Sequence, residues 1–171
     1  MRKGTIRVIA AAAAAWMILP SASALADDPD FVAFGAGWFD WNRQKKQAAE
    51  INLEYRSDRK FWIFKPLAGA MATSTGSFYG YAGVGVDVFF GRRFVVTPSF
   101  APGLYIEGGG HDLGHVIEFR SQAEFAYRFD DRSRLGFAIS HISNASIGDN
   151  NPGTELFTLY YSVPFSKLFG R

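Results

Sequence analysis

A short stretch near the carboxyl-terminal end of the chain carries residue types that suit acyl transfer. It runs from Ser140 to Glu155 and contains His141 and Ser143, two positions apart. A serine hydroxyl is a weak nucleophile until a base removes its proton, histidine is the usual base, and a carboxylate can fix the imidazole tautomer. His141, Ser143 and Glu155 are therefore a candidate base, nucleophile and orienting acid.

The pleat of two β-strands would bring these three side chains together. Residues i and i+2 of a strand point to the same face, so His141 and Ser143 share a face with the bulky apolar residues that precede them. Glu155 heads the matching apolar face of the next segment, and the loop Asn144–Pro152 joins the two. If that face contacts lipid, a polar group on it is energetically unfavourable unless it is paired or has a function.

The same residues also have less specific interpretations. A His-x-Ser pair is frequent by chance, Ser143 could begin a turn, and His141 could be an interfacial side chain. Ser146 is a competing nucleophile, but it lies in the loop, with no strand to fix its direction. Main-chain N–H groups between Asn144 and Asn151 are candidates for an oxyanion hole.

The candidate residues would be held by segments of about ten residues in which apolar and polar side chains alternate. Such segments, separated by turn residues, are typical of a membrane barrel. After residue 26 no segment reaches 18 consecutive apolar residues, so a spanning helix is not expected there. We predict an all-β fold, an eight-stranded antiparallel transmembrane β-barrel. Its predicted strands are Phe31–Trp41, Ala48–Arg56, Lys60–Ala70, Ser77–Phe90, Arg92–Tyr105, His115–Arg128, Arg132–Ser143 and Gly153–Phe165.

Alternation alone does not decide whether the apolar face lies inside, as in a soluble barrel, or outside. Three features favour the membrane barrel. Residues 1–26 look like an export signal, the strands are long enough to cross a bilayer core, and the connections alternate in length. The longer loops are predicted at Asn42–Gln47, Met71–Gly76, Ile106–Gly114 and Asn144–Pro152. The tight turns, on the side of both termini, are predicted at Ser57-Asp58-Arg59, Gly91-Arg92 and Phe129-Asp130-Asp131.

The charged face of the strands would then lie inside the barrel. An eight-stranded barrel is filled by side chains rather than open as a pore, and buried charges must be paired. We expect a paired internal network made of Glu50, Glu54, Asp87, Glu118, Arg120, Glu124 and Arg128.

Residues 1–26 have the pattern of a cleaved secretory signal peptide. Arg2, Lys3 and Arg7 precede an apolar run from Val8 to Leu19, and Ala24-Leu25-Ala26 fits an A-x-A cleavage signal. The run is shorter than the about 20 residues of a spanning helix.

Residues 27–171 are then expected to form the outer-membrane barrel domain. Loss of three basic residues leaves 15 of the 18 against 16 acidic ones, a net charge of −1, which does not suggest a nucleic-acid binder. The chain has no cysteine, so a small exported fold must be held by something other than disulfides, and a closed barrel would do so. His111 and His115 lie in the loop that contains Gly108-Gly109-Gly110, but two histidines without a third ligand are a weak case for zinc. No metal or cofactor is expected.

The Ser140–Glu155 stretch resembles the last hairpin of the outer-membrane lipid A 3-O-deacylases. The resemblance rests on His-x-Ser-Asn-Ala followed by Asn-Pro-Gly-x-Glu, and it is specific only over this stretch. It implies that His141 is the base, Ser143 the nucleophile and Glu155 the orienting acid, with Asn144 implicated in the oxyanion hole.

Further expectations follow from this resemblance. Ser146 and Asn151 would help to shape the site, and Ser146 stands at a position that is Gly in some relatives. The chain also continues past Phe169, whereas many outer-membrane barrels end in an aromatic residue. The implied substrate is lipid A, or lipopolysaccharide, in the outer leaflet of a Gram-negative outer membrane. The ester-linked acyl chain at the 3-position would be removed without a cofactor.

Basic residues of the first outer loop, Arg43, Lys45 and Lys46, are candidates to hold the phosphates of this substrate, and an ordinary solvated loop is the alternative. The sequence leaves a monomer and a homodimer open. Two other functions compete with the enzyme. One is a non-enzymatic outer-membrane barrel for adhesion or anchoring, and the other is a soluble lipid-binding barrel of the lipocalin type.

Overall fold

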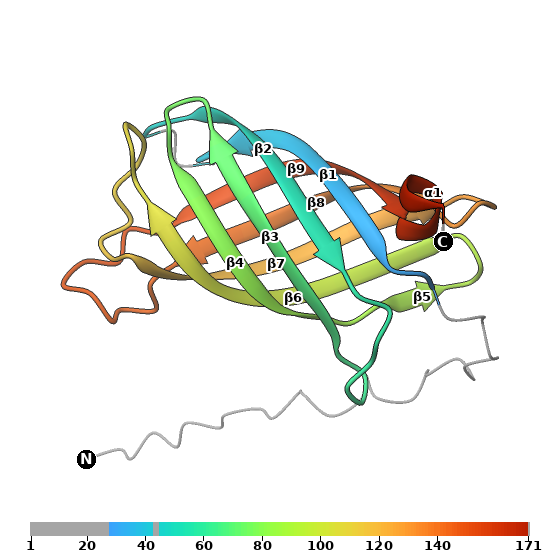
Figure 1. Ribbon diagram of the computed structural model, residues 1–171. Coiled ribbons are helices and arrows are strands. Elements are labelled where there is room, and N and C mark those ends of the chain that lie inside the picture. The colour runs from blue at the N-terminus through green and yellow to red at the C-terminus, as the bar shows by residue number, and fades with distance from the viewer. Residues whose placement is uncertain (1–27, 43–44, 171) are drawn as a thin grey trace, which may run out of the picture.

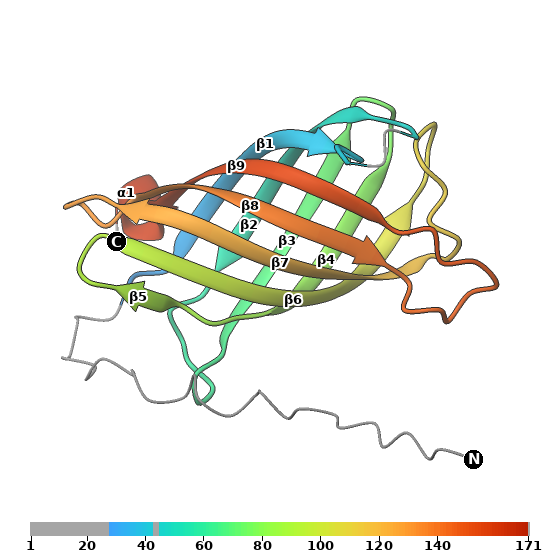
Figure 2. The same ribbon diagram turned by 180° about the vertical axis from the view of Figure 1, so that it is seen from behind.

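The computed structural model of the protein describes residues 28–42 and 45–170, so the predicted signal peptide lies outside the described residues. Antiparallel strands form one sheet that closes on itself (Figures 1 and 2). The strands are β1 (Phe31–Phe39), β2 (Ala48–Arg56), β3 (Lys65–Thr73), β4 (Phe78–Gly85), β5 (Val88–Phe90), β6 (Phe94–Ile106), β7 (Ile117–Arg128), β8 (Arg134–Ser143) and β9 (Thr154–Pro164). A short helix, α1 (Phe165–Phe169), follows the last strand.

The predicted eight-stranded antiparallel barrel is confirmed, with one interruption. β4 pairs with the second part of β6 and β5 with its first part, so together they act as one barrel strand. The predicted continuous strand Ser77–Phe90 is therefore wrong at Asp87, which turns its carboxylate inward. The ladder tolerates the break because Pro98, which lies opposite Val86 on β6, has no N–H to donate, while its carbonyl accepts the Val86 N–H at 3.0 Å.

The connections at β3 differ from the prediction. β3 begins at Lys65 rather than at residue 60, because Phe61 and Phe64 pair with each other in a small hairpin of their own. The predicted three-residue turn after β2 is therefore wrong, and the connection runs from residue 57 to residue 64. The predicted long loop Met71–Gly76 is also wrong, since β3 extends to Thr73, whose hydroxyl accepts the Ser77 N–H at 3.0 Å.

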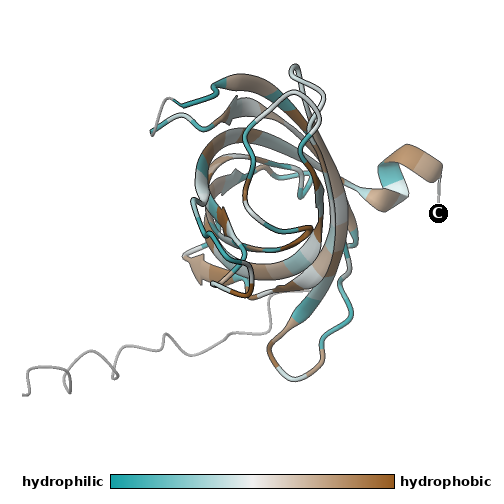
Figure 3. Ribbon diagram, turned by 90° about the vertical axis from the view of Figure 1, so that its left-hand side faces the viewer, coloured by the Kyte–Doolittle hydropathy of each residue, from teal (hydrophilic) through white to brown (hydrophobic). Residues whose placement is uncertain are grey.

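The outer wall of the barrel is apolar. Outward side chains such as Leu53, Phe100 and Leu135 are about half exposed, whereas most of their inward neighbours along each strand are buried. Figure 3, which looks onto the end where the long β6–β7 and β8–β9 connections lie, shows the brown, hydrophobic ribbon segments around the ring. This is the inverse of a soluble barrel, in which the apolar side chains point inward, and it is the pattern of a membrane barrel. Within the described residues no helix is long and apolar enough to cross a membrane.

Ion pairs fill the interior from the turn end to the middle of the barrel. Near the turn end Arg134 pairs with Asp28 and with Asp87, which also accepts from Lys65 at 3.0 Å, and Arg128 lies 3.0 Å from Asp28. A second layer forms around Glu54. In it, Arg56 and Arg120 lie 2.7 Å and 2.5 Å from Glu54, and Arg56 also lies 2.6 Å from Glu124. The predicted pairing is thus confirmed for Glu54, Asp87, Arg120, Glu124 and Arg128.

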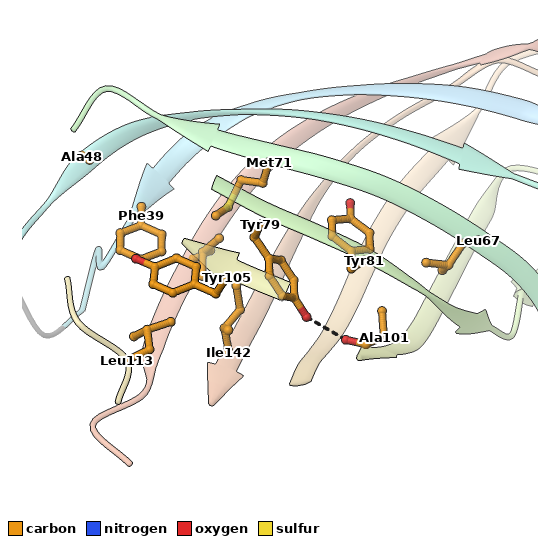
Figure 4. Packing of buried hydrophobic residues seen from close by; sticks show 11 residues of the cluster. Phe39, Ala48, Leu67, Met71, Tyr79, Tyr81, Ala101, Tyr105, Leu113 and Ile142 are labelled. Carbon is orange, nitrogen blue, oxygen red and sulfur yellow. Dashed lines mark hydrogen bonds between the residues drawn. The ribbon is translucent and has the colours of Figure 1, made fainter. Parts of the chain in front are cut away.

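The predicted pairing is wrong for the two acids nearest the loop end. Glu50 accepts a hydrogen bond from Thr158 rather than from a cation, and neither oxygen of the buried Glu118 has a partner among the described residues. Their part of the interior is lined by an aromatic and aliphatic cluster instead. Figure 4 shows Tyr79 and Tyr105 in this cluster, with the Tyr79 hydroxyl donating to the Ala101 carbonyl at 2.9 Å.

Candidate active site

His141 and Glu155 face each other on neighbouring strands of the outer wall. The register of β8 and β9 pairs the two residues directly. The imidazole Nδ1 lies 3.3 Å from Glu155 Oε1, and both side chains keep part of their surface exposed. With Nδ1 turned to the carboxylate, Nε2 is the nitrogen left to take a proton from a nucleophile.

Ser143 stands on the same outward face as His141, at the last position of β8. The β8–β9 register ends with Ile142 opposite Thr154, so one further step places Ser143 opposite Gly153. In the described part of the chain no hydrogen bond joins the Ser143 hydroxyl to the imidazole. Such contacts are often long before substrate binds and tighten in the complex.

Gly153 fixes where the imidazole lies. Its φ of 60° is in the left-handed region, which glycine enters without steric cost. An ideal Cβ at this position would lie 3.0 Å from His141 Cε1 and 3.4 Å from Nε2. The outer edge of the ring therefore packs directly on the Gly153 backbone, at the level of Ser143, and a larger residue would push it away.

Asn144, directly after the candidate nucleophile, ties the β8–β9 loop (residues 144–153) to the β6–β7 loop (residues 107–116). It is fully buried, and its Nδ2 donates to the carbonyls of Leu113 at 2.9 Å and Asn150 at 2.7 Å. Its Oδ1 accepts the Ser146 N–H at 2.9 Å, and its own N–H donates to Asn151 Oδ1 at 3.1 Å. This geometry gives Asn144, Ser146 and Asn151 a part in shaping the loop.

The turn after Asn144 holds two non-glycine residues in the left-handed region. Ala145 and Ser146 have φ of 52° and 62°, and the Ile147 N–H donates to the Asn144 carbonyl at 3.1 Å. Turns with positive φ at both central residues are dominated by Gly, Asn and Asp. The backbone strain is on the order of 1–3 kcal/mol per residue. The hydrogen bonds of Asn144 stabilise the turn in this conformation. Such stored strain is frequent at functional sites.

Aromatic residues surround the polar patch on the barrel wall. The Trp41 N–H donates to the Glu155 carbonyl at 3.2 Å, and the Trp41 ring lies 6.4 Å from that of Phe157. Phe157 also stacks on Phe137 at 5.9 Å, and Phe119 stands opposite Ser143 on β7. The patch therefore borders a wall suited to hydrocarbon chains.

The first loop reaches the same end of the barrel. The N–H groups of Lys45 and Lys46 both donate to Asp40 Oδ2 at 2.7 Å, and both lysine residues are exposed. Arg43, the third predicted phosphate ligand, lies outside the described residues. Asp40 was not singled out from the sequence, although an Asp in a turn directly after a strand is a frequent cap of main-chain N–H groups.

The two loop histidines have structural contacts. The His111 carbonyl accepts the Tyr105 hydroxyl at 2.8 Å, and His115 Nδ1 accepts the Ile117 N–H at 2.9 Å. In the portion of the chain that the structure describes, no group of three or more His, Cys, Asp or Glu is placed to hold a metal ion.

Comparison with known proteins identifies the family of the chain. The model of the lipid A 3-O-deacylase (PagL) family matches residues 31–164. A lipid A deacylase PagL of Pseudomonas aeruginosa (strain PAO1) is 28% identical over 83 residues, which span 48% of this chain and 40% of that relative.

Two solved structures share the fold. A crystal structure of the outer membrane enzyme PagL superposes with a TM-score of 0.63 at 18% identity, over 78% of this chain and 99% of that one. A de novo designed transmembrane β-barrel gives 0.57 at 11% identity, over 81% and 98%. Because the family model covers nearly the whole barrel from β1 to β9, the chain belongs to the PagL family of lipid A 3-O-deacylases.

Proposed function

We propose that this protein is an outer-membrane hydrolase that removes the ester-linked acyl chain from the 3-position of lipid A. Family membership supports the substrate class. The observation that carries the chemistry is the outward-facing His141–Glu155 pair, 3.3 Å apart, with Ser143 two residues along the same face. A hydrolase of a membrane lipid needs its nucleophile on the lipid side of the barrel, and this is the face on which the three residues stand.

The proposed reaction follows the acyl-enzyme route. Ser143 Oγ attacks the ester carbonyl while His141 Nε2 takes the hydroxyl proton, and Glu155 stabilises the imidazolium that forms. The imidazolium then protonates the 3-oxygen of the sugar as the C–O bond to the acyl group breaks. A water molecule, deprotonated by His141, hydrolyses the acyl-enzyme, releases the fatty acid and restores the Ser143 hydroxyl.

The developing oxyanion needs hydrogen-bond donors near Ser143. The N–H groups of Asn144 and Ser146 already donate within the loop. Among the described residues the Ala145 N–H donates to no protein atom. We assign it as a donor to the oxyanion, which is consistent with the cost of holding Ala145 in the left-handed region.

The site also fits a place in the outer leaflet. Its residues lie at the long-loop end of the barrel, beside an aromatic wall along which acyl chains can lie. Residues 1–26 would direct export and be removed, which leaves residues 27–171 as the barrel domain. Lys45 and Lys46, with Arg43, would attract the phosphates of lipid A from the water side.

The test is incubation of the purified, folded barrel with lipid A, followed by mass analysis of the products. Loss of one hydroxyacyl chain from the 3-position is expected from the parent protein, and no loss from Ser143→Ala. Ser146→Ala is the matched control and should remain active, since Ser146 lies in the loop. An inactive parent barrel, or activity that survives in Ser143→Ala and disappears in Ser146→Ala, would contradict the proposal.

A further inference from the structure

A polar groove opens between the β6–β7 and β8–β9 loops, which lie side by side in both views of the barrel (Figures 1 and 2). Its volume is about 460 Å³, and it is lined by Asp112, Gly114, Asn150, Asn151 and Pro152. Ligand sites in proteins have volumes of about 300–1,000 Å³ and use a few placed polar groups. The groove is open to solvent along one side, and its lining is more polar than that of a site for a hydrocarbon chain.

The groove is held in shape before any ligand arrives. The buried Asn144 amide donates a hydrogen bond to one carbonyl of each loop, that of Leu113 and that of Asn150. Gly114 has a φ of 85°, and an ideal Cβ there would lie 2.4 Å from the Asn150 carbonyl oxygen. Only glycine permits this close approach of the two loops. A preformed site lowers the entropy that a ligand must lose on binding.

The groove adjoins the candidate triad on its loop side. Asn151, which lines it, accepts the N–H of Asn144, the residue next to Ser143. Pro152, which also lines it, precedes Gly153, on which the His141 ring packs. A ligand in the groove would therefore extend to the nucleophile, while the aromatic wall beyond His141 receives an apolar group.

The lining residues suit hydroxyl groups rather than anions. One oxygen of Asp112 accepts the Gly114 N–H at 2.8 Å, which holds the carboxylate at the rim of the groove. Asp112 and Asn150 are exposed. Carboxylate and amide side chains accept and donate hydrogen bonds to hydroxyls, and no lining residue is Lys or Arg.

We propose that this groove binds the sugar ring that carries the scissile ester, through Asp112 and the side chain of Asn150. The inference rests on the proposed function, in which the ester oxygen belongs to a sugar and the ring must lie within a few bonds of Ser143. Polar groups in the groove and apolar groups on the wall then match the two halves of the substrate. The sugar side of the substrate is recognised by the two loops, and the acyl side by the barrel.

The experiment compares two substrates in the same detergent micelles, lipid A and a p-nitrophenyl ester of a long-chain fatty acid that has no sugar. The variants are Asp112→Ser, in which the serine hydroxyl can still accept the Gly114 N–H, and Asn150→Ala, which keeps the main-chain carbonyl that holds Asn144. Asp149→Ser is the matched control, because Asp149 is exposed in the same loop but does not line the groove. Folding is checked by the heat-dependent gel shift of each barrel.

Each groove variant should lower kcat/KM on lipid A by about 3- to 10-fold, as expected for the loss of one hydrogen bond. The ratio of lipid A to ester activity should fall by the same factor, mainly through KM, and Asp149→Ser should leave that ratio at the parent value. An equal loss on both substrates would show that the residues only support the loop, and an unaltered ratio would show that the groove binds no sugar. Either result overturns the inference while leaving the proposed function intact. A parent barrel that cleaves the ester but not lipid A would instead contradict the proposed function.

Discussion

Two acid–base contacts show how differently this barrel treats charge on its two faces. Inside, Arg120 and Glu54 lie 2.5 Å apart with almost no exposed surface, and the Arg120 guanidinium stacks 3.8 Å from the centre of the Tyr81 ring. On the outer wall, His141 and Glu155 are 3.3 Å apart, and 43% of the histidine side chain is exposed. The inner pair cannot be reached from outside the barrel, whereas the outer pair leaves one imidazole nitrogen accessible to a substrate. We infer that the inner contact holds the fold and the outer contact serves chemistry.

The largest expected effect is on the outer pair and its nucleophile. Ser143→Ala and His141→Asn should each abolish deacylation, and Glu155→Ala should be milder, because a poorly oriented imidazole can still act as a base. In a serine protease the corresponding losses of turnover are about 2 × 10⁶ for nucleophile or base and about 3 × 10⁴ for the acid. Only the ordering should transfer to this protein. Rates on lipid A are to be measured for single and combined variants, with folding checked by gel shift.

The combined variants decide whether the three residues act as a unit. The double variant of Ser143 and His141 should be no slower than either single variant. Losses that multiply, or a Glu155→Ala variant slower than Ser143→Ala, would contradict a triad.

The inner pair should behave in the opposite way. Arg120→Met leaves Glu54 without one of its two cations, and breaking a buried pair from one side costs about 3–5 kcal/mol of unfolding free energy. Urea unfolding in lipid vesicles measures this loss, and the molecules that remain folded should keep the parent turnover. Arg93→Met is the matched control, because its pair with Asp130 is exposed and should contribute less than about 1 kcal/mol. Equal losses from both variants would refute the contrast between buried and exposed charges.

Gly153 connects the outer pair to the backbone. Gly153→Ala should lower kcat by about 10- to 100-fold, since displacement of a catalytic group by an ångström can cost that much, while KM for lipid A changes little. Gly76→Ala is the control: its φ of 85° gives similar backbone strain, but nothing lies within 4 Å of an added Cβ. Both variants should lose similar stability, and only the first should lose turnover. A Gly76→Ala variant as slow as Gly153→Ala would attribute the effect to strain alone.

The smallest effect concerns the basic residues of the first loop, of which Lys45 and Lys46 are exposed. Conversion of Arg43, Lys45 and Lys46 together to Gln should raise KM for lipid A a few-fold at low ionic strength, through weaker attraction of its phosphates. Because exposed charges are screened within about 10 Å at 0.1 M salt, the difference from the parent should shrink as salt is added. Kinetics at two salt concentrations would measure it. A triple variant with parent kinetics at low salt would assign the loop an ordinary solvated role.

Much of this protein follows from period-two alternation, which is a local property. The alternation in β2 and β7 predicted one charged and one apolar face, because neighbouring side chains of a strand must point to opposite faces. The same rule placed His141 and Ser143 on one face. The export signal, the strand lengths and the alternating connection lengths then indicated that the apolar face lies outside. The interruption at Asp87 was not predictable, since it depends on Lys65 and Arg134 reaching it across the interior.

The loops show the limit of local rules most clearly. The sequence suggested Asn144 as part of an oxyanion hole, but its amide holds carbonyls of Leu113 and Asn150. Those partners come together only when the β6–β7 loop is brought against the β8–β9 loop. Gly153 was part of the recognised motif, yet its contact with the His141 ring requires the β8–β9 register.

The sequence by itself determined which face each residue of a strand occupies, and with it the candidate triad and the apolar wall. Barrel closure decided the rest: which cations reach Glu54, and why no cation reaches Glu118 among the described residues. Side-chain direction is fixed by the residue's own strand, whereas register and cross-barrel distance are set by all the strands together.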